Sequence, residues 1–228
     1  MPLEMNVRQA TMARWPSQGT EAGVSRKEEL LRRVLPFWGV AAALFGSHLL
    51  ALIASSTSGS RTIPEMVASV NRLFTAATPA RVFATLVWGT VDASGRGELV
   101  NAGHLPVVIV GRSGCRRIAS SGVPFGIFAG AAYESTRFIL ADGEQLVLVT
   151  DGITESTDGR DNEYGVEGLW SLVSAGDLEL SPEQAVSRYL EDVERHRGGQ
   201  APHDDVTVMV LRRDSTGPVS GFQLQQAI

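Results

Sequence analysis

The sequence predicts an α+β domain with an antiparallel sheet core and helices before and after the strands. Three observations support this class. Apolar residues recur at helical spacing over residues 64–77, and short β-rich segments separated by Gly-containing turns fill residues 82–150. Helical spacing then returns over residues 167–197, ahead of a final apolar strand. Because the strands are separated by short turns, we expect antiparallel hairpins and not parallel βαβ units.

The composition is that of an ordinary soluble globular protein. The chain has 228 residues, of which 43% are apolar and 20% charged, and its formal net charge is −5. These values exclude a disordered chain, a collagen and a coiled coil. The acidic balance argues against nucleic-acid binding, which needs a basic surface. The single cysteine, Cys115, can form no internal disulfide, so we expect a reduced, cytoplasmic location.

The N-terminal third of the chain begins without a clear pattern. Residues 1–25 have no hydrophobic period and are predicted to be a poorly ordered tail. The pair Ser25 and Glu28 resembles a capping box that starts a short helix through Val34. No charged residue then occurs before Arg61, and Val34–Ala54 is long enough to cross a bilayer. A buried helix over residues 40–54 of a soluble domain fits the same residues, so both interpretations stay open.

The central elements follow from periodicity and turn residues. A helix is predicted over Pro64–Ala77, where the apolar side chains share one face. Strands are predicted, in chain order, at Val82–Asp92, Glu98–Ala102, Pro106–Val110, Cys115–Ala119, Ser135–Leu140 and Gln145–Thr150.

Two helices and one strand are predicted near the C-terminus. The helix at Glu167–Ser174 is short. The helix at Ser181–Arg197 has the stronger start signal, a Ser followed by Pro and, three residues on, by Gln. A last strand is predicted at Val206–Arg212, and residues 214–228 are expected to form a loose tail.

Two acidic sites at strand ends are the candidates for chemistry. Asp151 and Gly152 follow the apolar run Leu146–Val149 almost directly, and Asp204 and Asp205 immediately precede the last strand. If the two strands are neighbours, these carboxylates converge and need a hard cation such as Mg²⁺ or Mn²⁺. Asp is also a common turn residue, and that simpler interpretation stays open.

Five short motifs in a fixed order resemble a known family. They are Asn101–Pro106 (NAGHLP), Gly122–Gly126 (GVPFG), Thr150–Glu155 (TDGITE), Tyr164–Gly165 (YG) and Asp204–Thr207 (DDVT). This series resembles the metal-dependent PPM-type protein phosphatases, in particular the bacterial stage II sporulation E (SpoIIE) type. The resemblance covers residues 39–213.

The resemblance implies a serine/threonine phosphatase with an α/β-β/α sandwich fold and antiparallel sheets. In the family, two Mn²⁺ or Mg²⁺ ions activate a water that attacks the phosphoserine or phosphothreonine phosphorus. The substrate it implies is a phosphorylated bacterial regulatory protein such as an anti-sigma-factor antagonist.

By position in the motifs, the expected metal ligands are Asp151 and Asp204, with Asp205 as a further ligand or a residue that orients one. Gly152, Asn101 and His104 are possible supporting residues. We expect Asn101 to satisfy backbone groups in its turn, and His104 is a candidate proton carrier.

The sequence departs from the family ahead of Gly39. The family has a Gly-Asp-Val-Ser-Gly-His-Gly segment there, whereas this chain reads Val-Leu-Pro-Phe-Trp-Gly over residues 34–39, and residues 1–33 contain no Asp. We therefore expect residues 1–38 to be non-homologous, the first strands of the sandwich to be missing, and metal binding to be weakened. A shifted reading frame or a natural truncation would each explain the departure, and translation of the upstream DNA in the other frames distinguishes them.

Two rival interpretations follow. The chain could be a non-catalytic relative that binds a regulatory partner without hydrolysis. It could instead be membrane-anchored through Val34–Ala54, although the resemblance matches residues 40–53 to a packed, soluble helix and so makes a membrane unlikely.

Overall fold

The computed structural model describes residues 47–49, 51–53, 55, 62–79, 82–175, 178–202, 204–214 and 225–226. The N-terminal segment 1–38, the helix predicted through Val34 and most of the uncharged stretch lie outside these residues, as does most of the predicted C-terminal tail. Within the described residues, no helix has the length and apolar character needed to cross a membrane.

A first sheet has three antiparallel strands in the order β1-β2-β5. These strands are β1 (Leu86–Val91), β2 (Arg96–Ala102) and β5 (Thr136–Ile139). Strands β1 and β2 form the predicted hairpin, and their register pairs Leu86 with Ala102. The turn between them is held by the exposed Asp92, whose Oδ1 accepts hydrogen bonds from the backbone N–H groups of Ser94 and Arg96.

A second sheet has five described strands in the order β4-β3-β6-β7-β8, all antiparallel. They are β3 (Val107–Gly111), β4 (Gly114–Ile118), β6 (Gln145–Val149), β7 (Thr207–Arg212) and β8 (Gln225–Gln226). The hairpin expected between residues 135–140 and 145–150 does not form, because β5 belongs to the first sheet and β6 to the second. The tight turn at residues 141–143 carries the chain from one sheet to the other.

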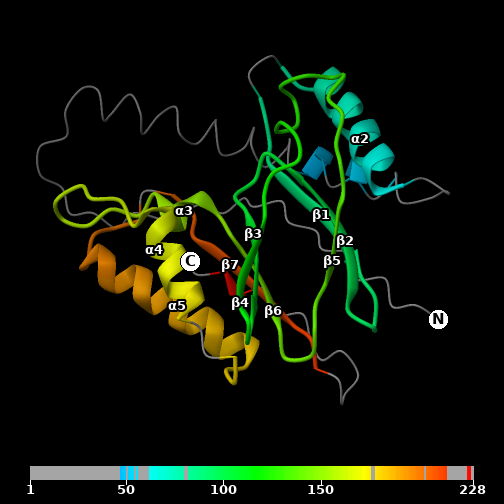
Figure 1. Cartoon of the computed structure of the whole chain (residues 1–228). Helices are drawn as coiled ribbons and strands as arrows, with labels where there is room; N and C mark the ends of the chain where they lie inside the picture. Colours follow the sequence, from blue (N-terminus) through cyan, green and yellow to red (C-terminus); the bar gives the residue numbers. More distant parts are fainter. Residues whose placement is uncertain are drawn as a thin grey trace, which may run out of the picture.

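The two sheets pack face to face, and helices cover both outer faces (Figure 1). Between the sheets lies a cluster of buried residues from both, including Val87, Leu99, Ile109 and Leu148. Helix α2 (Ile63–Ala77) packs on the first sheet together with helical residues Leu49 and Ile53. These layers are those of the predicted α/β-β/α sandwich, and the fold class is confirmed.

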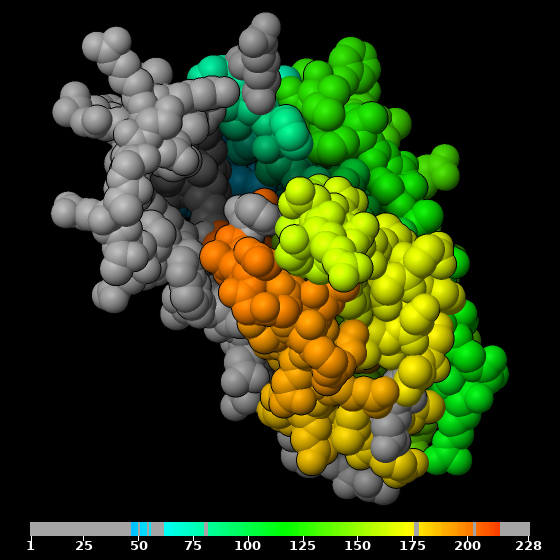
Figure 2. Space-filling model, turned by 90° about the vertical axis from the view of Figure 1, so that its left-hand side faces the viewer, coloured from blue at the N-terminus to red at the C-terminus, as the bar shows by residue number. Residues whose placement is uncertain are grey.

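Helices α4 (Gly165–Ser174) and α5 (Pro182–Arg197) cover the other face of the second sheet. Figure 2 shows them as the yellow and orange layers lying side by side on that face. Residues from both helices and from β3, β6 and β7 share one apolar cluster, which includes Val147, Val173, Tyr189 and Val208.

The predicted helix starts are largely confirmed. The Ser181 hydroxyl accepts a hydrogen bond from the Gln184 N–H, and the Gln184 side chain returns one to the Ser181 N–H, which completes the capping box of α5. Thr62 and Glu65 form the same arrangement at the start of α2. Two short elements were not predicted: the single-turn helix α3 (Asp151–Thr154) and strand β8 in the tail.

Candidate active site

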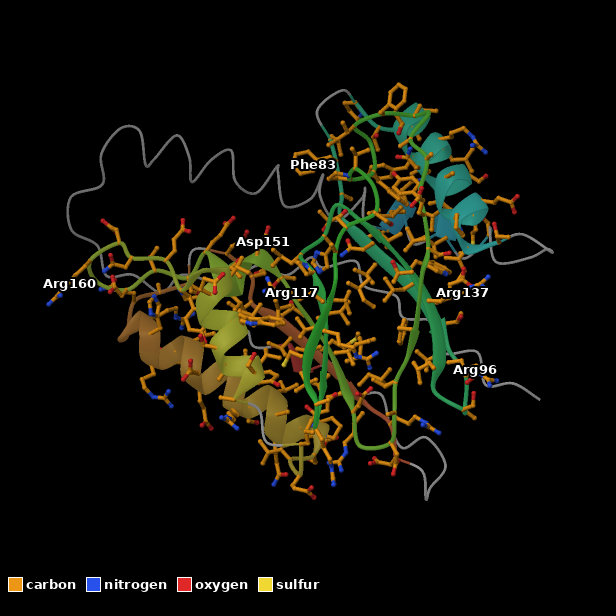
Figure 3. The ribbon with its side chains drawn as sticks, viewed as in Figure 1. Phe83, Arg96, Arg117, Arg137, Asp151 and Arg160 are labelled. Atoms are coloured by element: carbon orange, nitrogen blue, oxygen red, sulfur yellow. The ribbon has the colours of Figure 1, made fainter. Side chains whose placement is uncertain are left out.

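Asp151 lies where the buried strand β6 reaches the edge of the second sheet. All five residues of β6 are buried, as is Thr150, and the chain then turns into α3. Asp151 itself is exposed, and its Oδ1 accepts a hydrogen bond from the Gly152 N–H at 3.1 Å. Figure 3 shows it beside the upper ends of the strands. A carboxylate on this rim is free to meet a ligand from solvent.

Asp204 and Asp205 reach the same rim from β7. Strands β6 and β7 are neighbours, and their register pairs Val149 with Val208. Because the pair is antiparallel, the end of β6 adjoins the start of β7. Asp205 is half-buried, and Asp204 is exposed and accepts a hydrogen bond from the Asp205 N–H at 2.7 Å. The condition set by the sequence, that the two strands be neighbours, is therefore met.

Thr150 ties the two strand ends together. Its hydroxyl donates to the Asp205 carbonyl at 3.0 Å and accepts from the Thr207 N–H at 2.9 Å. Its backbone N–H also donates to the Thr207 carbonyl at 3.0 Å. Sequence reasoning assigned Thr150 no role, although it stands first in the TDG motif. Its buried hydroxyl bridges the segments that carry both acidic groups.

Gly152 permits the close approach of these segments. A Cβ atom at this position would lie 2.3 Å from the Asp205 carbonyl oxygen. No side chain fits there without moving the backbone that carries Asp205, so the supporting role expected for Gly152 is steric.

The acidic rim fits a hard cation only in part. Carboxylate oxygens from Asp151 and the Asp204–Asp205 pair are the donor type that Mg²⁺ and Mn²⁺ prefer. Within the part of the chain that the structure describes, however, no group of three or more His, Cys, Asp or Glu side chains is arranged to hold a metal ion. The strand ends that carry these acids adjoin, but the acidic side chains do not form a coordination shell.

Asn101 holds the turn that precedes His104. It is buried, with 1% of its surface exposed. Its Nδ2 donates to the Leu105 carbonyl at 3.0 Å, and its Oδ1 accepts from the His104 N–H at 2.9 Å. Gly103 within the turn has φ +72°, a conformation that favours glycine. The predicted structural role of Asn101, satisfying backbone groups in the turn, is what these contacts describe.

His104 lies next to the acidic rim. Its Nδ1 is 3.3 Å from the Thr85 Oγ1, and its Nε2 is buried without a hydrogen-bond partner among the described residues. Burial lowers the pKa of the imidazole below its usual value, and the negative charge of Asp151 partly opposes this shift. The ring is therefore neutral near pH 7 and within electrostatic reach of Asp151. Thr85 carries no sequence signal, because only the β1–β2 register brings it here.

Three further residues have side chains that could bind a metal or react, but the motifs assign them no role. Glu155 is an exposed residue that ends α3, and Cys115 is half-buried on β4. His203, which adjoins the acidic pair in sequence, lies outside the described residues.

The fold is that of the PP2C phosphatase domains. The chain matches the PP2C domain of SpoIIE from Bacillus subtilis, solved with a fragment of its regulatory domain, with a TM-score of 0.65 at 21% identity over 79% of this chain and 52% of that one. It matches the SiaA PP2C domain of Pseudomonas aeruginosa with a TM-score of 0.65 at 18% identity, over 77% of this chain and 70% of that one.

Residues 38–214 match the family "Stage II sporulation protein E (SpoIIE)". The chain belongs to this family, whose phosphatase domains are protein serine/threonine phosphatases of the PP2C or PPM type. Protein IcfG of Synechocystis is 27% identical over 136 residues, which are 58% of this chain. Stage II sporulation protein E of Bacillus subtilis is 25% identical over 154 residues, or 67% of this chain. The matched parts span only 21% and 18% of those two relatives.

Proposed function

We propose that this chain is a metal-dependent protein serine/threonine phosphatase that acts on a phosphorylated bacterial regulatory protein, such as an anti-sigma-factor antagonist, in the cytoplasm. The observation that carries the proposal is the position of Asp151 and the Asp204–Asp205 pair at adjoining strand ends of a SpoIIE-family sandwich. Among the structural matches is a Mycobacterium tuberculosis protein in which RsbU and RsbW domains occur together, with a TM-score of 0.63 at 24% identity over 79% of this chain and 51% of that one. That likeness supports a regulatory substrate.

The roles of the residues follow from their positions. Asp151 and Asp204 would hold Mn²⁺ or Mg²⁺, and the half-buried Asp205 would bind the same ion or orient its ligands. The bound metal supplies a water of lowered pKa and neutralises charge on the phosphoryl oxygens. Thr150 and Gly152 keep the two acidic segments in contact. His104, whose half-buried ring is neutral near pH 7, would contribute a hydrogen bond and not a charge.

The rival function is partner binding without hydrolysis. One specific observation favours it: the described residues contain no group of three metal-binding side chains. Residues 34–39, where the family resemblance places a further Asp-bearing segment, carry no acid. We therefore expect Mn²⁺ binding that is weak, with one ion and several waters, and a correspondingly high Mn²⁺ requirement.

The deciding experiment measures Mn²⁺-dependent release of phosphate from a phosphoserine peptide by the full chain. We expect Asp151→Asn to lower the rate by at least about 100-fold, since even residues that only support metal ligands cost up to that factor. The matched control is Glu155→Gln, an exposed acid four residues away, which should leave the rate within about twofold.

Mn²⁺ binding, followed by electron paramagnetic resonance, separates the two functions. Loss of both Mn²⁺ binding and phosphate release in Asp151→Asn would support the phosphatase function. If the wild-type chain binds Mn²⁺ but releases no phosphate, or if Asp151→Asn hydrolyses as fast as the wild type, the catalytic proposal is wrong and the partner-binding function replaces it.

A further inference from the structure

The position of His104 is set by two neighbours, Asn101 and Thr85, that the catalytic proposal does not otherwise use. Asn101 fixes the turn through hydrogen bonds to the His104 N–H and the Leu105 carbonyl. Thr85, at the entry to β1, approaches Nδ1 from the neighbouring strand. A side chain held in this way is pre-organised, because its backbone and one of its two ring nitrogens are already engaged.

The Thr85 contact is compatible with a neutral ring that carries its proton on Nε2, because a hydroxyl can either donate or accept. A neutral imidazole carries its proton on one nitrogen, and the other nitrogen accepts. The Thr85 hydroxyl can donate to Nδ1 at 3.3 Å, which leaves the proton on Nε2. An ionised carboxylate such as Asp151 accepts hydrogen bonds only, so its proximity favours the same tautomer.

The Nε2 atom is then a buried donor in need of an acceptor. It makes no hydrogen bond to any described residue, and a buried polar atom of this kind is uncommon in native proteins. The carboxylate whose charge acts on the ring is that of Asp151. Asp151 is exposed, and its Oδ1 accepts a hydrogen bond from the adjacent Gly152 N–H.

We propose that His104 is a positioning residue that donates its Nε2–H to the Asp151 carboxylate and so orients Asp151 toward a divalent cation. Thr85 can donate to Nδ1 in this tautomer, and Asn101 fixes the turn that carries the ring. The inference rests on the proposed function, because it assigns the residue that orients the candidate ligand Asp151. Hydrogen bonds to ligating carboxylates are worth about 10- to 100-fold in metal affinity.

The first test compares Mn²⁺ affinity, by electron paramagnetic resonance, in three variants of the full chain. In His104→Gln the amide nitrogen falls near the position of Nε2, whereas in His104→Asn it falls near that of Nδ1. We expect His104→Asn and His104→Ala to weaken Mn²⁺ binding by about 10- to 100-fold, and His104→Gln to stay within about threefold of the wild type. Equal weakening in all three variants, or weakening in none, would overturn the proposal.

The second test needs no metal and no activity. Long-range ¹H–¹⁵N spectra of histidine-labelled protein report which ring nitrogen carries the proton, and the His104 signals are those that vanish in His104→Gln. We expect the proton on Nε2, and a change in the Nε2 resonance in Asp151→Asn but not in the control Glu155→Gln. A proton on Nδ1, or equal responses to both substitutions, contradicts the inference. If the wild-type chain binds no Mn²⁺, the proposed function fails, while this measurement still decides the His104–Asp151 contact.

Discussion

Single residues determine how closely the two acidic segments approach. The Thr150 hydroxyl and the missing side chain of Gly152 together bring the Asp205 backbone against the first turn after β6. Neither residue has the chemistry of a metal ligand. Both nevertheless determine whether Asp151 and Asp205 share one site, because a shift of about 1 Å in a catalytic group can cost about 100-fold in rate.

Tyr133 offers a residue-level prediction about pH. It is buried against Phe125, its hydroxyl has no hydrogen-bond partner among the described residues, and burial raises its pKa to about 12. In the unfolded chain a tyrosine ionises near pH 10. The neutral form therefore favours the folded state below about pH 10, and that contribution is lost as the pH rises toward 12.

We expect Tyr133→Phe to be as stable as the wild type at about pH 8, or more stable by up to about 1 kcal/mol, because it removes an unpaired buried hydroxyl. Between about pH 8 and about pH 10.5 the variant should lose less stability than the wild type. Urea unfolding at both pH values measures this difference. Equal losses in the two proteins would show that the Tyr133 hydroxyl is solvated or paired in solution.

Among the elements, the helices begin where side chains replace missing backbone hydrogen bonds. The first N–H groups of a helix have no partner within it, and Ser181 with Gln184 satisfies two donors at the start of α5. The helix ends at Gly198, whose φ of +59° is in the left-handed region. Buried Val186, Tyr189 and Val193 then face the second sheet, so this cap positions the layer behind the acidic rim.

The cap of α5 is open to a direct test. We expect Ser181→Ala to lower the free energy of unfolding by about 1 kcal/mol, as the loss of an N-cap hydroxyl usually does. Ser187→Ala is the matched control, since Ser187 is exposed in the middle of the same helix, where alanine is at least as favourable. Thermal unfolding followed by circular dichroism compares them. A control that loses as much stability as Ser181→Ala would rule out the capping explanation.

At the scale of the molecule, the packing of the two sheets on each other brings His104 beside the acidic rim. The rim belongs to the second sheet, whereas Thr85 directly precedes β1 of the first. The β1–β2 register brings Thr85 to His104, so the place of this pair beside Asp151 depends on how the first sheet packs on the second. The cluster between the sheets, with Leu99 from one side and Leu148 from the other, sets that relation.

We expect Leu148→Ala to destabilise the fold by about 2–5 kcal/mol, because the side chain is 2% exposed between the sheets and its removal leaves a cavity. Ile139→Ala serves as the control: its side chain is 59% exposed on β5, and the cost should stay below about 1 kcal/mol. Urea unfolding gives both values. A small effect of Leu148→Ala would mean that the interface between the sheets relaxes around the gap.

Much of the secondary structure could be read from local signals. Helices α2 and α5 carry capping boxes, and β6 is a short apolar run bounded by turns, so their positions follow from neighbouring residues. Strand β1 is shorter than predicted. Residues 82–85 lie outside it, and among them only Ala84 forms a β-bridge, to Phe125. The hairpin predicted across residues 141–143 is wrong, since a short turn serves equally well to cross between two sheets.

The sequence by itself determined the α+β class, the order of the strands along the chain, the motifs of the SpoIIE type and the acids Asp151, Asp204 and Asp205 as candidates. These depend on residue type and local spacing, which are visible in one dimension. Only the tertiary structure decided that β6 and β7 are neighbours, that Thr150 and Gly152 join their ends, and that Thr85 meets His104. Such contacts arise from strand pairing and layer packing between residues far apart in the chain, for which a single sequence carries no local signal.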